Sequence, residues 1–95
     1  MAKFELGQLV ATRGVYEKMG EDNDFFDFVN ESMCRFESCD WGDMCSEDKA
    51  LNEEAVSIGE GRIHGSYIHK PSDEKIWIIT ESDRSATTIL FPSEY

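Results

Sequence analysis

The spacing of apolar residues changes along the chain, and each change predicts a different element. Residues 7–12 (GQLVAT) form a short apolar run that predicts a strand. Residues 22–36 instead repeat their apolar positions every three or four residues, which predicts an amphipathic helix. Asp22 or Asn23 is expected to cap its first turn. The residues on the predicted buried face are Phe25, Phe28, Val29, Ser32 and Phe36, with Phe26 and Met33 beside them.

Glycine and small polar residues predict where the neighbouring segments begin and end. Residues 14–20 are expected to form a short helical turn, closed by Gly20 as its C-cap. A further helix is expected over residues 47–58, with Ser46 as its N-cap and glycines at 59 and 61 ending it.

The last third of the chain has the pattern of strands joined by short turns. Residues 62–69, 75–80 (KIWIIT) and 85–91 (SATTILF) are rich in β-branched and aromatic side chains. The turns at 70–74 and 81–84 are short enough to join antiparallel neighbours. The order predicts an α+β domain: a short N-terminal strand, two helices and a three-stranded antiparallel meander, with the helices packed on one sheet face.

The length of 95 residues predicts a single domain covering 1–95, with a small core. Its acidic helical part spans about 15–58, and its β part spans about 62–92 together with the strand at 7–12. Hydrophobic residues make up 40% of the chain, which is typical of a folded domain and argues against disorder.

The distribution of charge says more about the function of the chain than any motif does. Twenty acidic residues face nine basic ones, giving a net charge of −11. Residues 17–54 hold thirteen acids and three bases, so this segment alone carries −10, whereas residues 1–16 carry +1. Direct binding to nucleic acid or to an anionic membrane is unfavourable for such a chain, because both need a basic footprint. The expected partner is therefore a basic protein surface.

Established patterns for metal binding and catalysis are not met. Cys34, Cys39 and Cys45 are spaced C-x4-C-x5-C, whereas structural zinc sites use closer cysteine pairs, and no EF-hand loop occurs. We find neither a nucleophile elbow nor a phosphate-binding loop, so the sequence predicts no catalytic residues, cofactor or metal. A zinc module built on the three cysteines stays a minor alternative. Their odd number fits reduced thiols and a cytoplasmic location, and no signal peptide or transmembrane run is found.

The acidic middle of the chain is the predicted site. The segment FESCDWGDMCSED (36–48) is expected to form an acidic turn between two helices, pinned by Trp41, which is also a candidate aromatic anchor for a partner. Carboxylates one helical turn apart could occupy a groove built for phosphates. The alternative is that the acidity serves only solubility. The predicted partner-binding residues are Glu21, Asp22, Asp24, Asp27, Glu31, Glu37, Asp40, Trp41, Asp43, Glu47 and Asp48.

Three stretches resemble a family of small proteins from bacterial plasmids, conjugative elements and phages. They are FELGQLVATRG (4–14), DWGD (40–43) and KIWIITESDRSATTILFPSEY (75–95), about half of the chain. The segment before DWGD is longer, richer in cysteine and more acidic than the family pattern. Some such proteins carry a restriction–modification label, but this chain has no room for a methyltransferase cofactor domain.

This resemblance implies a role in a mobile genetic element. Such elements carry small acidic proteins that block host nucleases, among them anti-restriction and anti-CRISPR proteins that mimic DNA. The expected function is thus non-enzymatic binding to a nucleic-acid-binding host defence complex. The alternative is a small accessory or regulatory domain of a plasmid or phage. A homodimer through an exposed strand edge, at 8–12 or 85–91, is compatible with the sequence.

Overall fold

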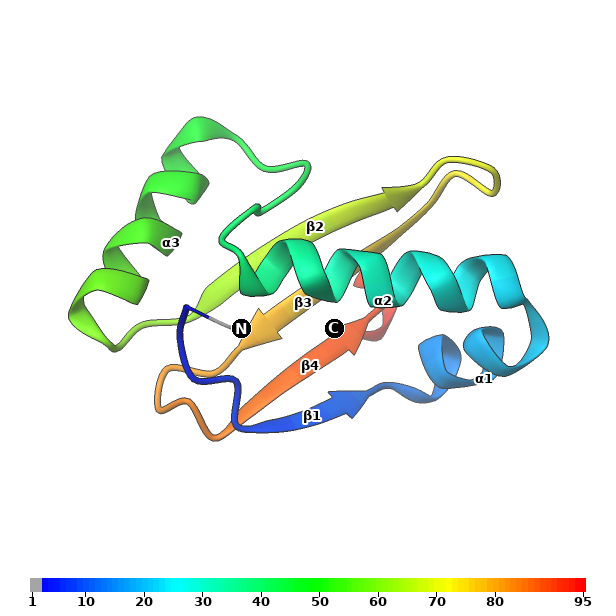
Figure 1. The fold of residues 1–95 in the computed structure, drawn as a ribbon, viewed down its shortest axis with the longest axis horizontal. Helices are drawn as coiled ribbons and strands as arrows, with labels where there is room; N and C mark the ends of the chain where they lie inside the picture. Colours follow the sequence, from blue (N-terminus) through cyan, green and yellow to red (C-terminus); the bar gives the residue numbers. More distant parts are fainter. Residues whose placement is uncertain (1–2) are drawn as a thin grey trace.

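The chain folds into a four-stranded sheet with one long helix across a single face (Figure 1). The computed structural model describes residues 3–95. The α+β prediction is confirmed, with three α-helices in place of the two expected. In chain order the elements are β1 (Gln8–Ala11), α1 (Arg13–Glu21), α2 (Asn23–Glu37), α3 (Ser46–Ile58), β2 (Ile63–His69), β3 (Glu74–Thr80), β4 (Ala86–Leu90) and the 3-10 helix η1 (Pro92–Glu94).

The strands follow the order β1-β4-β3-β2. β2, β3 and β4 form the predicted antiparallel meander, with Ser66 opposite Trp77 and Ile78 opposite Ile89. β1 adds a fourth strand, which runs parallel to β4 and places Leu9 opposite Thr87. The sheet is therefore mixed, and the predicted three-stranded antiparallel meander is only part of it. The apolar pattern of a four-residue strand cannot reveal this partner or its direction.

The predicted face of α2 forms the centre of the core. Phe25, Val29 and Phe36 are at most 1% exposed, and they pack with Tyr67 of β2 and Ile78 of β3 in one cluster. Burial of such side chains is worth about 1.5–3 kcal/mol each, so this face holds the helix on the sheet. Ser32 and Met33 are also buried and Phe28 is half-buried, whereas Phe26 is 45% exposed.

Two helix ends differ from the prediction. α1 is a full helix that continues through Gly20 and ends at Glu21, so Gly20 is not its C-cap. Asp22 follows in an extended conformation and caps α2, as expected. α3 begins at Ser46, so its N-cap is Cys45, which makes no side-chain capping hydrogen bond. Gly59 closes α3 in the left-handed region with φ of 81°, as predicted.

α3 lies beside β2, at the edge of the sheet (Figure 1). Its buried Asn52 bonds both backbone groups of His64: Nδ2 donates to the carbonyl at 2.7 Å, and Oδ1 accepts from the N–H at 3.0 Å. The prediction that the helices share one sheet face is therefore correct for α2 and wrong for α3. Within residues 3–95 no helix has both the length and the apolar character needed to cross a membrane.

Candidate functional site

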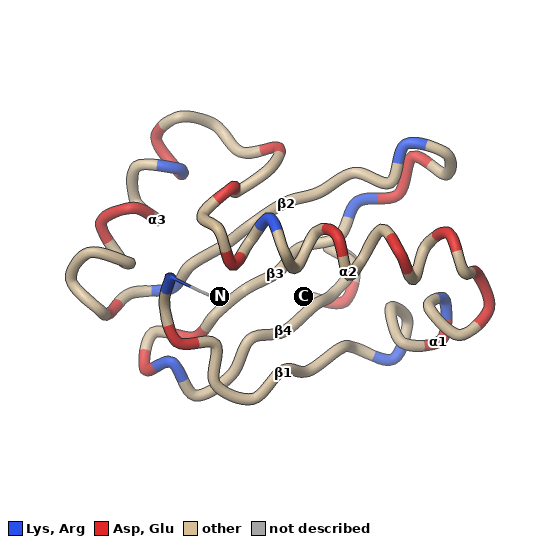
Figure 2. Tube along the Cα trace, in the orientation of Figure 1, with Lys and Arg blue, Asp and Glu red and all other residues tan. Residues whose placement is uncertain are grey.

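Acidic residues gather on the helices and on the turn between α2 and α3, whereas the strands carry few (Figure 2). The predicted acids nevertheless differ in what they contact. Asp22, Asp24, Asp40 and Asp43 are engaged by other groups of the protein, as described below. Five other predicted acids are exposed and form no ion pair with any residue in 3–95. These are Glu21, Asp27, Glu31, Glu47 and Asp48.

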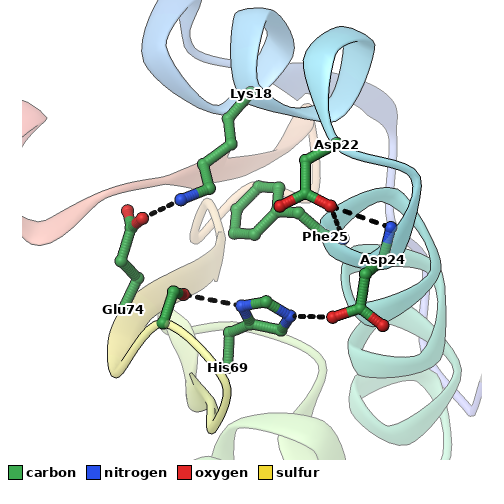
Figure 3. A network of polar contacts seen from close by, with 7 residues as sticks. Lys18, Asp22, Asp24, Phe25, His69 and Glu74 are labelled. Atoms are coloured by element: carbon green, nitrogen blue, oxygen red, sulfur yellow. Dashed lines mark hydrogen bonds and ion pairs between the residues drawn. The ribbon is translucent and has the colours of Figure 1, made fainter.

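Asp22 and Asp24 help to hold α2 in place (Figure 3). The Asp22 carboxylate accepts from the N–H groups of Asp24 and Phe25, at 3.0 and 3.2 Å, which caps the helix. The Asp24 carboxylate lies 2.7 Å from Nε2 of His69, a residue only 4% exposed at the end of β2. The His69 ring also packs edge-on against Phe25. Asp22 is thus a structural cap, and Asp24 joins the helix to the sheet.

Hydrogen bonds from the side chains of Arg35 and Tyr67 hold the turn that follows α2. Arg35 donates from Nε and Nη2 to the two carboxylate oxygens of Asp40, at 2.8 and 3.2 Å, and this contact lowers the Asp40 pKa. The hydroxyl of Tyr67 donates to the Asp40 carbonyl at 2.8 Å. Burial of that hydroxyl, more than the neighbouring Asp40 charge, raises the Tyr67 pKa strongly, so it stays a neutral donor. Asp40 therefore belongs to the framework of the turn.

Trp41 pins this turn, as predicted, but its side chain is buried and not exposed to a partner. The residue is 2% exposed, and its ring packs against Phe36 and Phe4. Its Nε1 donates to the carboxylate of Glu53 on α3, at 2.8 Å. The prediction of an exposed tryptophan was wrong because aromatic residues of the N-terminal segment and α2, far apart in sequence, meet over it.

Other aromatic side chains, on α1 and α2, are exposed and lie beside acids. Tyr16 is 72% exposed and Phe26 is 45% exposed, and with Met19 they line an open groove of about 460 Å³ between α1 and α2. Glu17, Gly20 and Glu21 complete its wall. We call these six residues the α1–α2 groove. Tyr16 was not among the residues predicted from the sequence, although Tyr16 and Met19 stand three apart on α1 and could have indicated an apolar stripe.

The outward face of α2 carries the free carboxylates Asp27 and Glu31, one helical turn apart. Their side chains are about 5–6 Å apart at Cβ by helix geometry. Glu37, at the end of the helix, is half-buried, and its carbonyl accepts from the N–H of Lys3. The predicted row of acids therefore remains available on α2, but it does not continue through the turn as a set of free charges.

A second depression lies between α3 and the sheet face opposite α2. It has a volume of about 370 Å³, and its lining mixes Asp43 and Asp48 with Arg62 and Lys75. Asp43 and Lys75 lie 3.7 Å apart, so this acid is partly neutralised. The mixed charge makes this depression a poorer match for a basic partner than the α1–α2 groove.

Two polar atoms of this depression are buried without a hydrogen-bond partner in residues 3–95. They are Nε2 of His64 and Oγ of Ser66. Burial, with a smaller contribution from Arg62, lowers the His64 pKa. Because neither atom has a partner, the two side chains are not hydrogen-bonded to each other.

The three cysteines are not placed together as ligands of one metal ion. Cys34 and Cys45 are exposed and Cys39 is half-buried, and all three are free thiols. Over the described part of the chain, no group of three or more His, Cys, Asp or Glu residues is placed to hold a metal ion. Burial, with a smaller contribution from Glu53, raises the Cys39 pKa, which disfavours the thiolate that metals bind.

Comparison of the chain with protein-family models, with curated proteins and with solved structures finds no match in any of the three.

Proposed function

We propose that this protein binds a basic, nucleic-acid-binding surface of a host defence complex, presenting carboxylates where that surface expects phosphates. The observation that carries the proposal is the α1–α2 groove, where exposed Tyr16 and Phe26 lie beside the carboxylates of Glu17 and Glu21. The resemblance to proteins of mobile elements motivates the choice of a defence complex as the partner.

The free acids supply the electrostatic part of this interaction. Glu21, Asp27 and Glu31 are exposed and unpaired within the described residues, so their charges face solvent. A groove lined by Lys and Arg attracts such a surface over a Debye length of roughly 8–10 Å at ordinary salt. Glu47 and Asp48 form a second set of exposed acids, beyond the turn, on the first turn of α3. Binding should therefore be fast and sensitive to salt.

The exposed aromatics supply the anchoring part. Aromatic side chains dominate the energetics of many protein interfaces, because they bury a large area at a small cost in rotamer entropy. In the proposed complex, Tyr16 and Phe26 contact the aliphatic stems and apolar residues between the partner's basic side chains. Asp22, Asp40 and Trp41 take no direct part, since they hold α2 and the turn in shape.

The test is a capture experiment with two variants of equal charge. The first variant replaces the free acids of the proposed surface: Glu21→Gln, Asp27→Asn and Glu31→Gln. The control replaces three exposed acids elsewhere: Glu54→Gln, Glu60→Gln and Asp73→Asn. Tagged proteins are incubated with a nuclease-treated bacterial lysate at low and high salt, and captured proteins are identified by mass spectrometry. Duplex DNA is then added as a competitor.

The proposal predicts a captured nucleic-acid-binding protein that both salt and duplex DNA release. At about 0.5 kcal/mol per exposed charge pair, the first variant should bind roughly tenfold more weakly, whereas the control variant should bind like the wild type. Equal weakening by both variants would indicate that only net charge matters. If no basic protein is captured, or if DNA does not compete, the mimicry proposal is wrong and solubility becomes the better account of the acidity.

A further inference from the structure

The two edges of the sheet differ in whether their outward backbone groups are hydrogen-bonded. At the β2 edge, Asn52 bonds the backbone of His64, and the segment around Gly42 bonds the backbone of Ser66. The Ser66 N–H donates to the Trp41 carbonyl at 3.0 Å, and its carbonyl accepts from the Asp43 N–H at 2.6 Å. The backbone groups of this edge are therefore covered along much of their length.

The β1 edge, at the opposite margin of the sheet, is open (Figure 1). The N–H groups of Gln8 and Thr12 donate to the carbonyls of Ser85, directly before β4, and Ile89, within it. Because backbone groups alternate along a strand, Leu9 and Ala11 point theirs away from β4. No hydrogen bond within residues 3–95 uses these outward groups. Such an edge is a template for another strand.

The charge near β1 indicates which kind of molecule could add a strand to this edge. Residues 1–16 carry a net +1 in a chain of −11, and the carboxylate of Glu94, which accepts from Thr12 and Gly14, offsets that charge at the end of β1. Leu9 is 55% exposed and Val10 is 39% exposed, and β1 itself has no charged residue. A basic partner gains nothing here, whereas two copies of this acidic chain can approach at this edge with little repulsion.

We infer that the protein forms a homodimer by antiparallel pairing of β1 with β1 of a second copy, centred on Val10. In this register Leu9 of each copy faces Ala11 of the other, and the two residues exchange both of their backbone hydrogen bonds. All the outward groups of β1 are then satisfied. The two Val10 residues form a non-hydrogen-bonded pair, in which the Cα atoms are about 4.5 Å apart.

The twofold axis of this dimer is perpendicular to the joined sheet, as for any antiparallel pair in a continuous sheet. Both copies of α2 therefore lie on the same face, and the dimer presents two sets of the α2 acids in one direction. The inference does not depend on the proposed function, because the dimer forms without any other partner.

Disulfide trapping tests the register. In a background with Cys34→Ser and Cys45→Ser, which removes the exposed native thiols, one variant carries Val10→Cys and its control carries Leu9→Cys. The Val10 Cα separation of about 4.5 Å fits a disulfide. The two Leu9 residues are offset by two positions, so their Cα atoms are about 8–9 Å apart, beyond disulfide reach. Mild oxidation should cross-link Val10→Cys at least several-fold faster.

Mass measurement in solution tests the dimer itself. Light scattering on a size-exclusion column should give about twice the chain mass of 10.9 kDa at high protein concentration. Val10→Lys places a charge against its own copy and should give the monomer mass, whereas Leu51→Lys, at an exposed leucine of α3, should leave the dimer intact. Circular dichroism confirms that each variant is folded.

Three results would overturn the inference. The first is a monomer mass for the wild type at all concentrations up to roughly 0.5 mM, where even weak dimers form. The second is an unchanged dimer in Val10→Lys, which would place the interface elsewhere. The third is equal cross-linking by Leu9→Cys and Val10→Cys, which would contradict the Val10-centred register. Trapping needs no lysine at the edge, so it decides the matter even if Val10→Lys does not fold.

Discussion

Asn52 links α3 to the sheet, and its replacement tests how the β2 edge is protected. The side chain is 3% exposed and makes two hydrogen bonds to the backbone of His64. On α3, Ala55 is buried alongside it and Val56 packs on the core. The helix is also bonded through Glu53 to Trp41 and through the Ala55 carbonyl to Arg84. Asn52→Ala removes both bonds and leaves the His64 N–H and carbonyl without partners.

The loss of stability in Asn52→Ala comes from the unpaired N–H and carbonyl of His64. A buried backbone group that loses its partner costs about 1–3 kcal/mol, and water reaching the edge after the truncation lowers this penalty. We expect Asn52→Ala to reduce the free energy of unfolding by about 2–4 kcal/mol. For a domain of this size, the loss corresponds to a fall in melting temperature of roughly 10–25 °C.

Urea unfolding followed by circular dichroism measures this effect, with Asn30→Ala as the control. Asn30 is an exposed residue of α2 whose amide donates to the Phe26 carbonyl one turn earlier. It undergoes the same chemical change and the same gain in helix propensity, so its free energy of unfolding should change by no more than about 0.5 kcal/mol. Equal effects of the two substitutions would show that Asn52 does not hold α3 on the sheet.

Three further predictions concern the surroundings of β2. Gly42→Ala would place a Cβ 2.1 Å from the Ser66 carbonyl oxygen at a φ of +75°. Urea unfolding should therefore show that the free energy of unfolding falls by about 3 kcal/mol or more. The control is Gly59→Ala, at a φ of +81° with no atom within 4 Å, which should lower the free energy of unfolding by only about 1–2 kcal/mol. Ser66→Ala removes a buried hydroxyl without a partner and should raise the free energy of unfolding by about 1 kcal/mol, whereas a loss would reveal a hydrogen-bond partner. Because burial holds the folded-state pKa of His64 below its ordinary 6.5, the unfolded chain takes up the proton first, so stability should decrease as the pH falls through 6.5. His64→Gln should flatten this decrease in melting temperature, and an unchanged slope would exclude His64 as its source.

Much of the secondary structure could be predicted because its signals are local. The apolar repeat over residues 22–36 places α2 within one residue of its observed bounds, and the β-branched run KIWIIT lies within β3. The cap at Asp22 and the left-handed Gly59 follow from backbone chemistry that depends only on near neighbours. At Gly20 the same reasoning failed, because the backbone stays helical through Glu21 and the extended residue that ends the helix is Asp22.

The candidate site was less predictable, because the state of a charged or aromatic side chain depends on distant partners. The sequence shows that acids concentrate in residues 17–54, and the exposed acids of α2 agree with that pattern. It could not show that Arg35 binds Asp40, or that Glu53 on α3 accepts from Trp41. Nor could it show that the exposed aromatic groove lies between α1 and α2, at Tyr16 and Phe26.

The amino-acid sequence alone is enough to predict the class of fold, the strands and main helices, and the segregation of negative charge, because each depends on composition or on periodicity over a few residues. Three other features depend on long-range packing: β1 pairs parallel with β4, α3 covers the β2 edge through Asn52, and the β1 edge stays open. These features arise from contacts between residues far apart in the chain, such as Leu9 with Thr87 and Asn52 with His64. Such contacts form only when the whole core is packed, and no local pattern encodes them.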